Sequence, residues 1–243
     1  MQPFLSVIIP VYNEERRINS LLKILNYLKT KTFTSEVVLV NDGSSDDTVK
    51  KIKSIQQKTK KTFPQLKLIS YTKNMGKGHA VKEGMMASSG KNRLFLDIDL
   101  STPIEEFDKF EGYLKKFDVI IGSRKASGAK LVKRQPIIRE LLGRGFTKLS
   151  QIILGVKVSD FTCGFKCFSQ KAASEFFSHQ RINRWGFDSE ILFLAKKLGF
   201  KVKEIPVVWK NDSETKVKLP HDIINSLIDL YKIRYNDFKK IYH

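Results

Sequence analysis

The feature that most constrains the fold of this chain is a repeat of short apolar segments, each followed by polar or glycine residues and a helix-like stretch. Segments rich in Val, Ile and Leu lie at residues 5–10, 36–42, 66–70, 93–101 and 117–122. Such runs are typical of strands buried on both faces of a parallel sheet. Because helical crossovers join successive parallel strands, the pattern predicts an α/β fold with a mostly parallel central sheet flanked by helices.

The fourth of these segments ends in two carboxylates, Asp97 and Asp99. Side chains alternate along a strand, so the two acids are expected to point the same way. Like charges at that spacing repel unless a cation lies between them, and Mg²⁺ or Mn²⁺ prefers carboxylate oxygens, often together with substrate phosphates. The pair predicts a divalent-cation site at the carboxyl end of the sheet. The alternative is a polar strand exit with two solvated acids.

The net charge limits the classes of partner. The 243 residues include 44 Lys and Arg against 25 Asp and Glu, a formal net charge of +19. Such an excess favours phosphorylated substrates, acidic lipid surfaces or nucleic acid. The alternative is a lysine-rich composition that only aids solubility. Without a motif of stacking aromatic residues, nucleic acid is not an expected partner.

The cysteines and the glycine loop exclude several classes of protein. Cys163 and Cys167 imply no disulfide framework and favour a reducing cytoplasm. The sequence predicts neither a signal peptide nor an apolar run of about 18 residues that could span a membrane. The loop Gly76-Lys77-Gly78 is not a Walker motif, and no Gly-x-Gly-x-x-Gly follows the first segment. These absences argue against P-loop hydrolysis and dinucleotide redox chemistry.

The second half of the chain departs from the repeat. Residues 123–134 are polar and basic, which predicts a long functional loop. Apolar residues at helical spacing from 220 to 235 predict a C-terminal amphipathic helix. We therefore expect a catalytic domain over residues 1–218 and a helical tail over 219–243. The tail could lie on an anionic membrane face or pack on the domain.

Five motifs in order carry a family resemblance. They are Pro10-x-Tyr12-Asn13-Glu14, Asn41-Asp42-Gly43-Ser44, Gly76-Lys77-Gly78, Asp97-x-Asp99 and Gly122-Ser123-Arg124. Together they resemble family 2 glycosyltransferases of the GT-A fold, over about residues 4–218. Segments 132–143, 160–166 and 185–190 are similar to the dolichyl-phosphate β-glucosyltransferase branch, whose nearest sisters are the dolichyl-phosphate mannose synthases.

The resemblance implies a role for each matching residue. Donor-nucleotide binding would fall to Pro10, Tyr12, Glu14, Asp42, Lys77 and Asp97. The Mg²⁺ or Mn²⁺ ion would bind Asp97 and Asp99. Phosphate groups of the acceptor would contact Arg124, Arg134 and Arg139. The residues expected to be catalytic are Asp99, Arg124, Arg139 and Asp188. Asp188 and Glu190 would lie near the sugar; the alternative is the acidic pair that a helix N-terminus favours.

The chain also departs from the family pattern. Asn41-Asp42 stands where Asp-Asp is frequent, and Leu100-Ser101 follows the acidic pair, so a third metal ligand is unassigned. Many relatives carry transmembrane helices, which this sequence does not predict.

The resemblance implies an inverting transfer of a hexose, glucose from UDP-glucose, to polyprenyl or dolichyl phosphate by a protein peripherally bound at the cytosolic face of a membrane. An alcohol acceptor needs a general base poised near neutrality. A phosphate monoester, with a second pKa of about 6, is already largely dianionic. A basic loop without an obvious base therefore favours a lipid phosphate. Two alternatives stay open: a saccharide or protein hydroxyl as acceptor, and a non-catalytic basic module that binds nucleotide sugars or nucleic acid.

Overall fold

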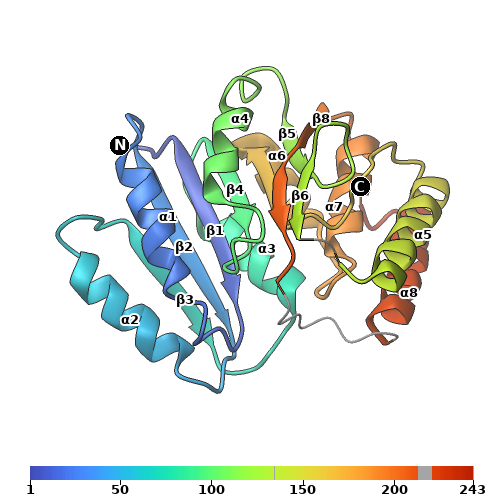
Figure 1. The fold of residues 1–243 in the computed structure, drawn as a ribbon. Helices are drawn as coiled ribbons and strands as arrows, with labels where there is room; N and C mark the ends of the chain where they lie inside the picture. Colours follow the sequence, from blue (N-terminus) through green and yellow to red (C-terminus); the bar gives the residue numbers. More distant parts are fainter. Residues whose placement is uncertain (134, 213–220, 243) are drawn as a thin grey trace.

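The computed structural model describes residues 1–133, 135–212 and 221–242 (Figure 1). Arg134, predicted to bind the acceptor phosphate, lies outside the described residues, as do residues 213–220 and His243. Within the described part, the chain forms a seven-stranded sheet, a separate pair of short strands and helices on both faces of the large sheet.

The large sheet is mostly parallel. Its strands are β1 (Leu5–Val11), β2 (Ser35–Asp42), β3 (Leu66–Tyr71), β4 (Asn92–Leu96), β5 (Val119–Ser123), β7 (Phe165–Ser169) and β8 (Val202–Pro206). They lie in the order β3-β2-β1-β4-β7-β5-β8, and only β7 runs antiparallel to its neighbours. The predicted α/β fold is confirmed.

Helices cover both faces of this sheet (Figure 1). They are α1 (Ser20–Lys29), α2 (Thr48–Thr59), α3 (Lys77–Ala87), the 3₁₀ turn η1 (Ile104–Phe107), α4 (Asp108–Glu111), α5 (Ile137–Leu154), α6 (Gln170–His179), α7 (Phe187–Lys197) and α8 (His221–Phe238). Buried residues of α1, α2, η1 and α4 form one core cluster, whereas α3, α6, α7 and α8 contribute to another.

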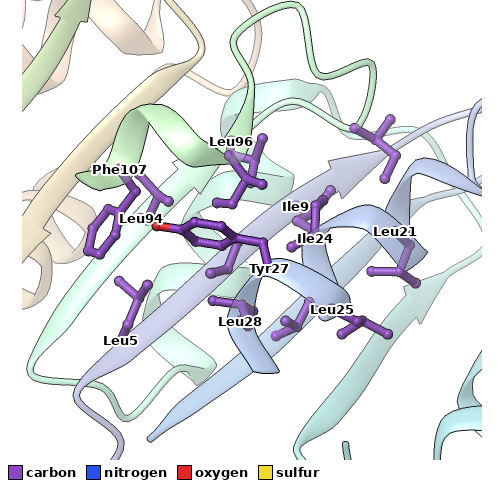
Figure 2. Close-up of a cluster of buried hydrophobic side chains, with 14 of the residues drawn as sticks. Leu5, Ile9, Leu21, Ile24, Leu25, Tyr27, Leu28, Leu94, Leu96 and Phe107 are labelled. Atoms are coloured by element: carbon purple, nitrogen blue, oxygen red, sulfur yellow. The ribbon is translucent and has the colours of Figure 1, made fainter. Parts of the chain in front are cut away.

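Strand alternation explains why two cores form. Leu5 and Ile9 of β1 pack toward α1, whereas Ile8 between them belongs to the opposite cluster. Figure 2 shows the first cluster, in which α1 contributes apolar side chains at the spacing of one helix face: Leu21, Ile24, Leu25 and Leu28. This packing fixes the positions of the strand ends on which the site is built.

The basic stretch 123–134 is only partly the loop that the sequence predicts. Within it, β6 (Lys130–Lys133) pairs in parallel with β9 (Val208–Lys210) to form the second sheet. The Lys130 N–H also donates a hydrogen bond to the Val207 carbonyl. Because β6 is largely exposed and its stabilising bonds join backbone groups distant in sequence, no apolar pattern predicts it.

The predicted C-terminal amphipathic helix corresponds to α8, which lies beside α5 (Figure 1). Its residues Leu230 and Ile233 are buried in the same cluster as α7. The boundary between a domain over 1–218 and a tail over 219–243 stays a prediction. In the part of the chain that the structure describes, no helix combines the length and apolar character needed to span a bilayer.

Candidate active site

A cleft of about 710 Å³ opens where the parallel strands β1, β2 and β4 end. It gathers residues that are far apart in the sequence, because parallel strands present their carboxyl ends at one edge of the sheet. Nine of the predicted site residues line it: Pro10, Tyr12, Glu14, Asp42, Lys77, Asp97, Asp99, Arg124 and Arg139. The sequence motifs therefore converge on one site.

Asp42, the last residue of β2, holds the glycine loop in place. Its carboxylate accepts hydrogen bonds from the backbone N–H groups of Met75 (2.7 Å) and Gly76 (2.9 Å) and from the Asn74 side chain. Gly76 has a φ of 107°, and a Cβ there would clash with the Asn183 carbonyl. The loop before α3 thus needs both the acid and the glycine. A direct role for Asp42 in nucleotide binding stays a prediction.

Asp97 and Asp99 both face the cleft, although strand alternation is the wrong reason. β4 ends at Leu96, and the two acids lie in the turn that follows. The Ser101 N–H donates to the Asp99 carboxylate at 2.8 Å, and Leu100 adopts a φ of 51°. A Cβ at Gly164 would overlap the Asp97 carboxylate. Gly164 is therefore a site residue that the motif contained but to which no role was assigned.

The charges around this pair suit a cation. Burial, reinforced by the negative charge of Asp97, raises the pKa of Asp99. Lys77 Nζ lies 2.7 Å from Asp97 Oδ1 and over the Phe95 and Trp185 rings. Although burial opposes its charge, Asp97 and Asp188 raise the pKa of Lys77.

The acids present fit Mg²⁺ or Mn²⁺ in one particular way. Among the described residues, no group of three or more His, Cys, Asp or Glu side chains could hold a metal. The carboxylates of Asp97 and Asp99 are two possible ligands. Mg²⁺ is commonly held by one or two carboxylates, with substrate phosphates and water completing its coordination. The third ligand that the sequence leaves unassigned would, on this fit, come from the donor.

Arg124 is fixed by a carboxylate to which no role was assigned from the sequence. Its Nε and Nη2 atoms each lie 2.7 Å from an oxygen of Asp160, and its backbone N–H bonds the same group. Although burial opposes ionisation, Arg124 lowers the pKa of Asp160 to about 2. The guanidinium also lies over the Trp209 ring. Asp160 lies in the segment 160–166, one of those that carry the family resemblance. Its place in that segment is the only feature of the sequence that points to a role for Asp160 in the site.

A second cleft of about 770 Å³ adjoins the first. Lys77, Arg124 and Arg139 line both, and the inner face of α5 forms one wall of the second through Gly143 and Thr147. Burial, with Arg124 nearby, lowers the pKa of Arg139 from its ordinary high value. Arginine side chains thus lie where the two clefts meet.

Asp188 lines this second cleft in a buried ion pair. Lys166 Nζ lies 2.6 Å from its carboxylate and also donates to the Cys163 carbonyl. Both side chains are almost wholly buried, and burial raises the pKa of Asp188 although Lys166 opposes this. Lys166 is a further residue to which no role was assigned from the sequence.

Glu190 is fully buried and lines neither of these clefts. Its carboxylate accepts hydrogen bonds from the N–H groups of Arg181 (3.0 Å) and Ile182 (2.9 Å) and from the Tyr242 hydroxyl (2.6 Å). Glu190 therefore anchors both the C-terminal segment and the loop that leads to Trp185. Its predicted place near the sugar is not supported by any contact with the clefts.

The α/β fold and the convergence of the motifs on one cleft are those of a glycosyltransferase, and sequence comparison shows the family. The profile of the family described as "Glycosyl transferase family 2" matches residues 6–177. The chain belongs to this family and is a glycosyltransferase with the GT-A fold. The family assignment favours an enzyme over a non-catalytic basic module.

Within this family, the chain is similar to curated enzymes named dolichyl-phosphate β-glucosyltransferase. The chain is 36% identical to a dolichyl-phosphate β-glucosyltransferase of Trichomonas vaginalis, over 95% of this chain and 70% of that protein. Enzymes of the same name from Dictyostelium discoideum and Saccharomyces cerevisiae are each 34% identical, over 96% and 98% of this chain and 74% and 78% of theirs.

Solved structures show the same fold at lower identity. Glucosyl-3-phosphoglycerate synthase from Mycobacterium tuberculosis, in complex with Mn²⁺, UDP-glucose and glycerol 3-phosphate, is similar with a TM-score of 0.67 and 19% identity, over 95% of this chain and 80% of that chain. The structure of the same protein in complex with Mg²⁺ and UDP also has a TM-score of 0.67, with 19% identity, over 95% of this chain and 79% of that chain.

Proposed function

We propose that this glycosyltransferase transfers glucose from UDP-glucose to the phosphate of a polyprenyl lipid of the dolichyl type. The observation that carries the proposal is the pair of adjoining clefts: one contains the donor motifs and acids, and Arg124 and Arg139 line both. The names of the curated relatives and the UDP-glucose bound to a protein of the same fold support it.

The first cleft would bind the donor. Pro10 near the end of β1, and Tyr12 and Glu14 directly after it, would contact the base and ribose of the nucleotide. Asp97 and Asp99 would hold Mg²⁺ or Mn²⁺ against the diphosphate. When bound, the ion would supply positive charge that stabilises the departing diphosphate. Lys77, already oriented by Asp97, would add a second positive charge at the same end.

The arginines would bind the acceptor phosphate beside the donor. Two phosphate-bearing substrates repel one another, and guanidinium groups relieve that repulsion while forming paired hydrogen bonds. An oxygen of the acceptor phosphate would attack the anomeric carbon as the bond to UDP breaks, and UDP would leave with the electron pair. A single displacement of this kind inverts the anomeric centre and gives a β-linked glucose.

The carboxylates of the second cleft favour a phosphate over an alcohol as acceptor. Of the described residues that line it, the two acids are Asp188, paired with Lys166, and Glu140, paired with Arg144. Each is already engaged by a cation, and an alcohol would need a base able to take its proton. A phosphate dianion needs none.

We place this reaction at the cytosolic face of a membrane, with the protein attached peripherally. The net charge of +19 supports attraction to anionic lipid headgroups. Attachment of this electrostatic kind weakens as salt rises.

The proposal is tested with the purified chain, Mn²⁺ and either radiolabelled UDP-glucose or GDP-mannose. Acceptors are a short polyprenyl phosphate, the matching polyprenol and a soluble saccharide. We expect label in the organic phase only with UDP-glucose and the phosphate, and a β-anomeric product by NMR. Equal transfer to polyprenol or saccharide would overturn the acceptor, and a preference for GDP-mannose would overturn the donor. The Asp99→Asn variant serves as the inactive control.

A further inference from the structure

The helix α5 presents its apolar face outward. Ile137, Ile138, Leu141 and Ile152 are 77%, 72%, 61% and 69% exposed. The residues of α5 that are buried include the polar Thr147 and Ser150. A surface helix of a globular protein ordinarily turns its apolar stripe toward the core. In α5 the inner face lines the second cleft instead. The apolar face of α5 therefore has no core to pack against, which suits an apolar partner outside this chain.

The neighbouring helix α8 repeats this arrangement. Leu230 and Ile233 pack inward, while a second stripe at helical spacing remains exposed. The two helices contact one another along one side of the molecule (Figure 1). We define the α5–α8 surface by the exposed apolar residues of both helices: Ile137, Ile138, Leu141, Leu142, Leu149, Ile152, Ile224, Leu227, Ile228, Tyr231, Tyr235 and Phe238.

Twelve exposed apolar residues thus lie on two helices that contact one another, and extended exposed apolar patches mark interaction sites. Exposed basic side chains accompany it: Arg144 and Lys148 on α5, and Lys232, Arg234 and Lys239 on or directly after α8. Glu140, Asp229 and Asp237 pair with three of them, but these acids are more buried than their partners. An apolar centre with basic residues around it suits an anionic leaflet.

We propose that the α5–α8 surface docks on an anionic lipid bilayer, with its apolar side chains at the boundary between headgroups and acyl chains. A second copy of this chain is the less favourable occupant, because it would bring a net charge of +19 against an equal charge. A bilayer supplies both the apolar phase and the opposite charge.

Continuity with the second cleft supports the same occupant. Leu142 belongs both to the exposed surface and to the lining of that cleft, and Ser226 of α8 lines it as well. From there the cleft reaches Arg124 and Arg139. A lipid whose phosphate binds these arginines would have its hydrocarbon chain directed along α5 toward the bilayer. This last step rests on the proposed transfer to a lipid phosphate, whereas docking names the surface that the proposed peripheral attachment would use.

The test measures flotation of the full chain with neutral phosphatidylcholine vesicles and with vesicles that also contain phosphatidylserine. The variants are Ile138→Glu with Leu141→Glu on α5, and Ile228→Glu with Tyr231→Glu on α8. Met86→Glu, at another exposed apolar residue on α3, is the matched control. Circular dichroism and thermal unfolding verify that each variant folds.

We expect the wild type and the Met86 control to bind anionic vesicles at low salt, and each double variant to lose at least tenfold in partitioning. Activity on a short soluble polyprenyl phosphate should stay unchanged in the α8 double variant and in the Met86 control, since none of their substituted residues lines either cleft. Equal binding by the double variants, or no preference for anionic vesicles, would overturn the proposal. A dimer of the wild type that the same substitutions dissociate would assign the surface to a second copy instead. Docking without any transfer would refute the proposed glucosyl transfer and leave the docking surface in place.

Discussion

The two ends of the active-site region use carboxylates in opposite ways. At the end formed by β4, Asp97 and Asp99 face the first cleft, and burial together with mutual repulsion raises the pKa of Asp99. At the other end, Asp160 is fully buried and serves to fix Arg124. One end therefore presents negative charge and the other presents positive charge.

This difference separates two requirements of the proposed reaction. A divalent cation needs exposed carboxylate oxygens, whereas a phosphate needs guanidinium groups whose own counter-charges do not compete for the ligand. Asp160 meets the second need because its oxygens bind one edge of Arg124 from inside the protein. Each of the following substitutions removes one element of the contrast, so together they test whether the ends act separately.

The largest effect is expected for Asp99→Asn, which removes the acid end. Turnover should fall about 10³-fold, as for loss of a main electrostatic contact in a transition state. The melting temperature should hold or rise, because the neutral amide relieves repulsion from Asp97. Steady-state kinetics and thermal unfolding check this, with the exposed Glu105→Gln as the control. Full activity of the variant in the presence of a chelator would contradict the cation site.

The next effect is expected for Asp160→Asn, which leaves Arg124 without its counter-charge. Breaking such a buried pair costs about 3 kcal/mol of unfolding free energy, measured by denaturant titration. The KM for the acceptor should rise more than that for the donor, a split that mere destabilisation would not produce.

A double variant separates stability from binding. Asp160→Asn combined with Arg124→Gln replaces the ion pair by two neutral groups and should recover much of the lost stability. Use of the acceptor should not recover, because no guanidinium remains in that position. Recovery of both would show that Arg124 serves the fold alone.

A smaller and more selective effect is expected for Arg139→Ala. Loss of a charge-assisted hydrogen bond corresponds to about 10- to 100-fold in the acceptor KM, with donor affinity nearly unchanged. Arg139→Lys should recover only part of the lost acceptor affinity, since a lysine lacks the planar pair of hydrogen-bond donors. Lys50→Ala, at an exposed residue of α2, controls for the change in net charge. Equal losses for donor and acceptor would assign Arg139 to the donor end.

The central sheet could be predicted because buried parallel strands leave a local signal: β1, β2 and β5 each contain a short run of Val, Ile or Leu residues. The motif residues at their ends could be placed together for the same reason. By contrast, the approach of Gly164 to Asp97 and the hydrogen bonds that Arg124 donates to Asp160 join segments distant in the sequence. Their geometry depends on tertiary packing, to which sequence spacing is blind.

The helices show a second limit of prediction from sequence. Apolar spacing predicts α8 as a helix, yet such spacing does not tell whether an apolar face of a helix meets the core or the surroundings. α1 turns Leu21 and Leu25 inward, whereas α5 turns Ile137 and Leu141 outward. The orientation of α5 follows from the cleft that its polar residues line.

Glu36, a buried carboxylate outside the clefts, gives the smallest effect and sharpens the contrast with the cleft acids. It lies at the start of β2, the end opposite Asp42, and accepts hydrogen bonds from Ser6, Ser89 and Lys67. These outweigh burial and lower the pKa of Glu36 from 4.5 to about 2. The ionised form therefore stabilises the fold above pH about 4.5, and this contribution is lost as the pH falls toward 2.

Glu36→Gln should thus cost about 1–2 kcal/mol near neutrality, a value reduced from the full pKa shift because Lys67 is solvent-exposed. Denaturant titrations at several pH values should show the difference from the wild type shrinking below pH about 4.5 and nearly vanishing near pH 2. Turnover at neutral pH should stay unchanged, because no lining residue of either cleft contacts Glu36 through the hydrogen bonds described. A constant difference at every pH would mean that the packing of Glu36, rather than its charge, stabilises the fold.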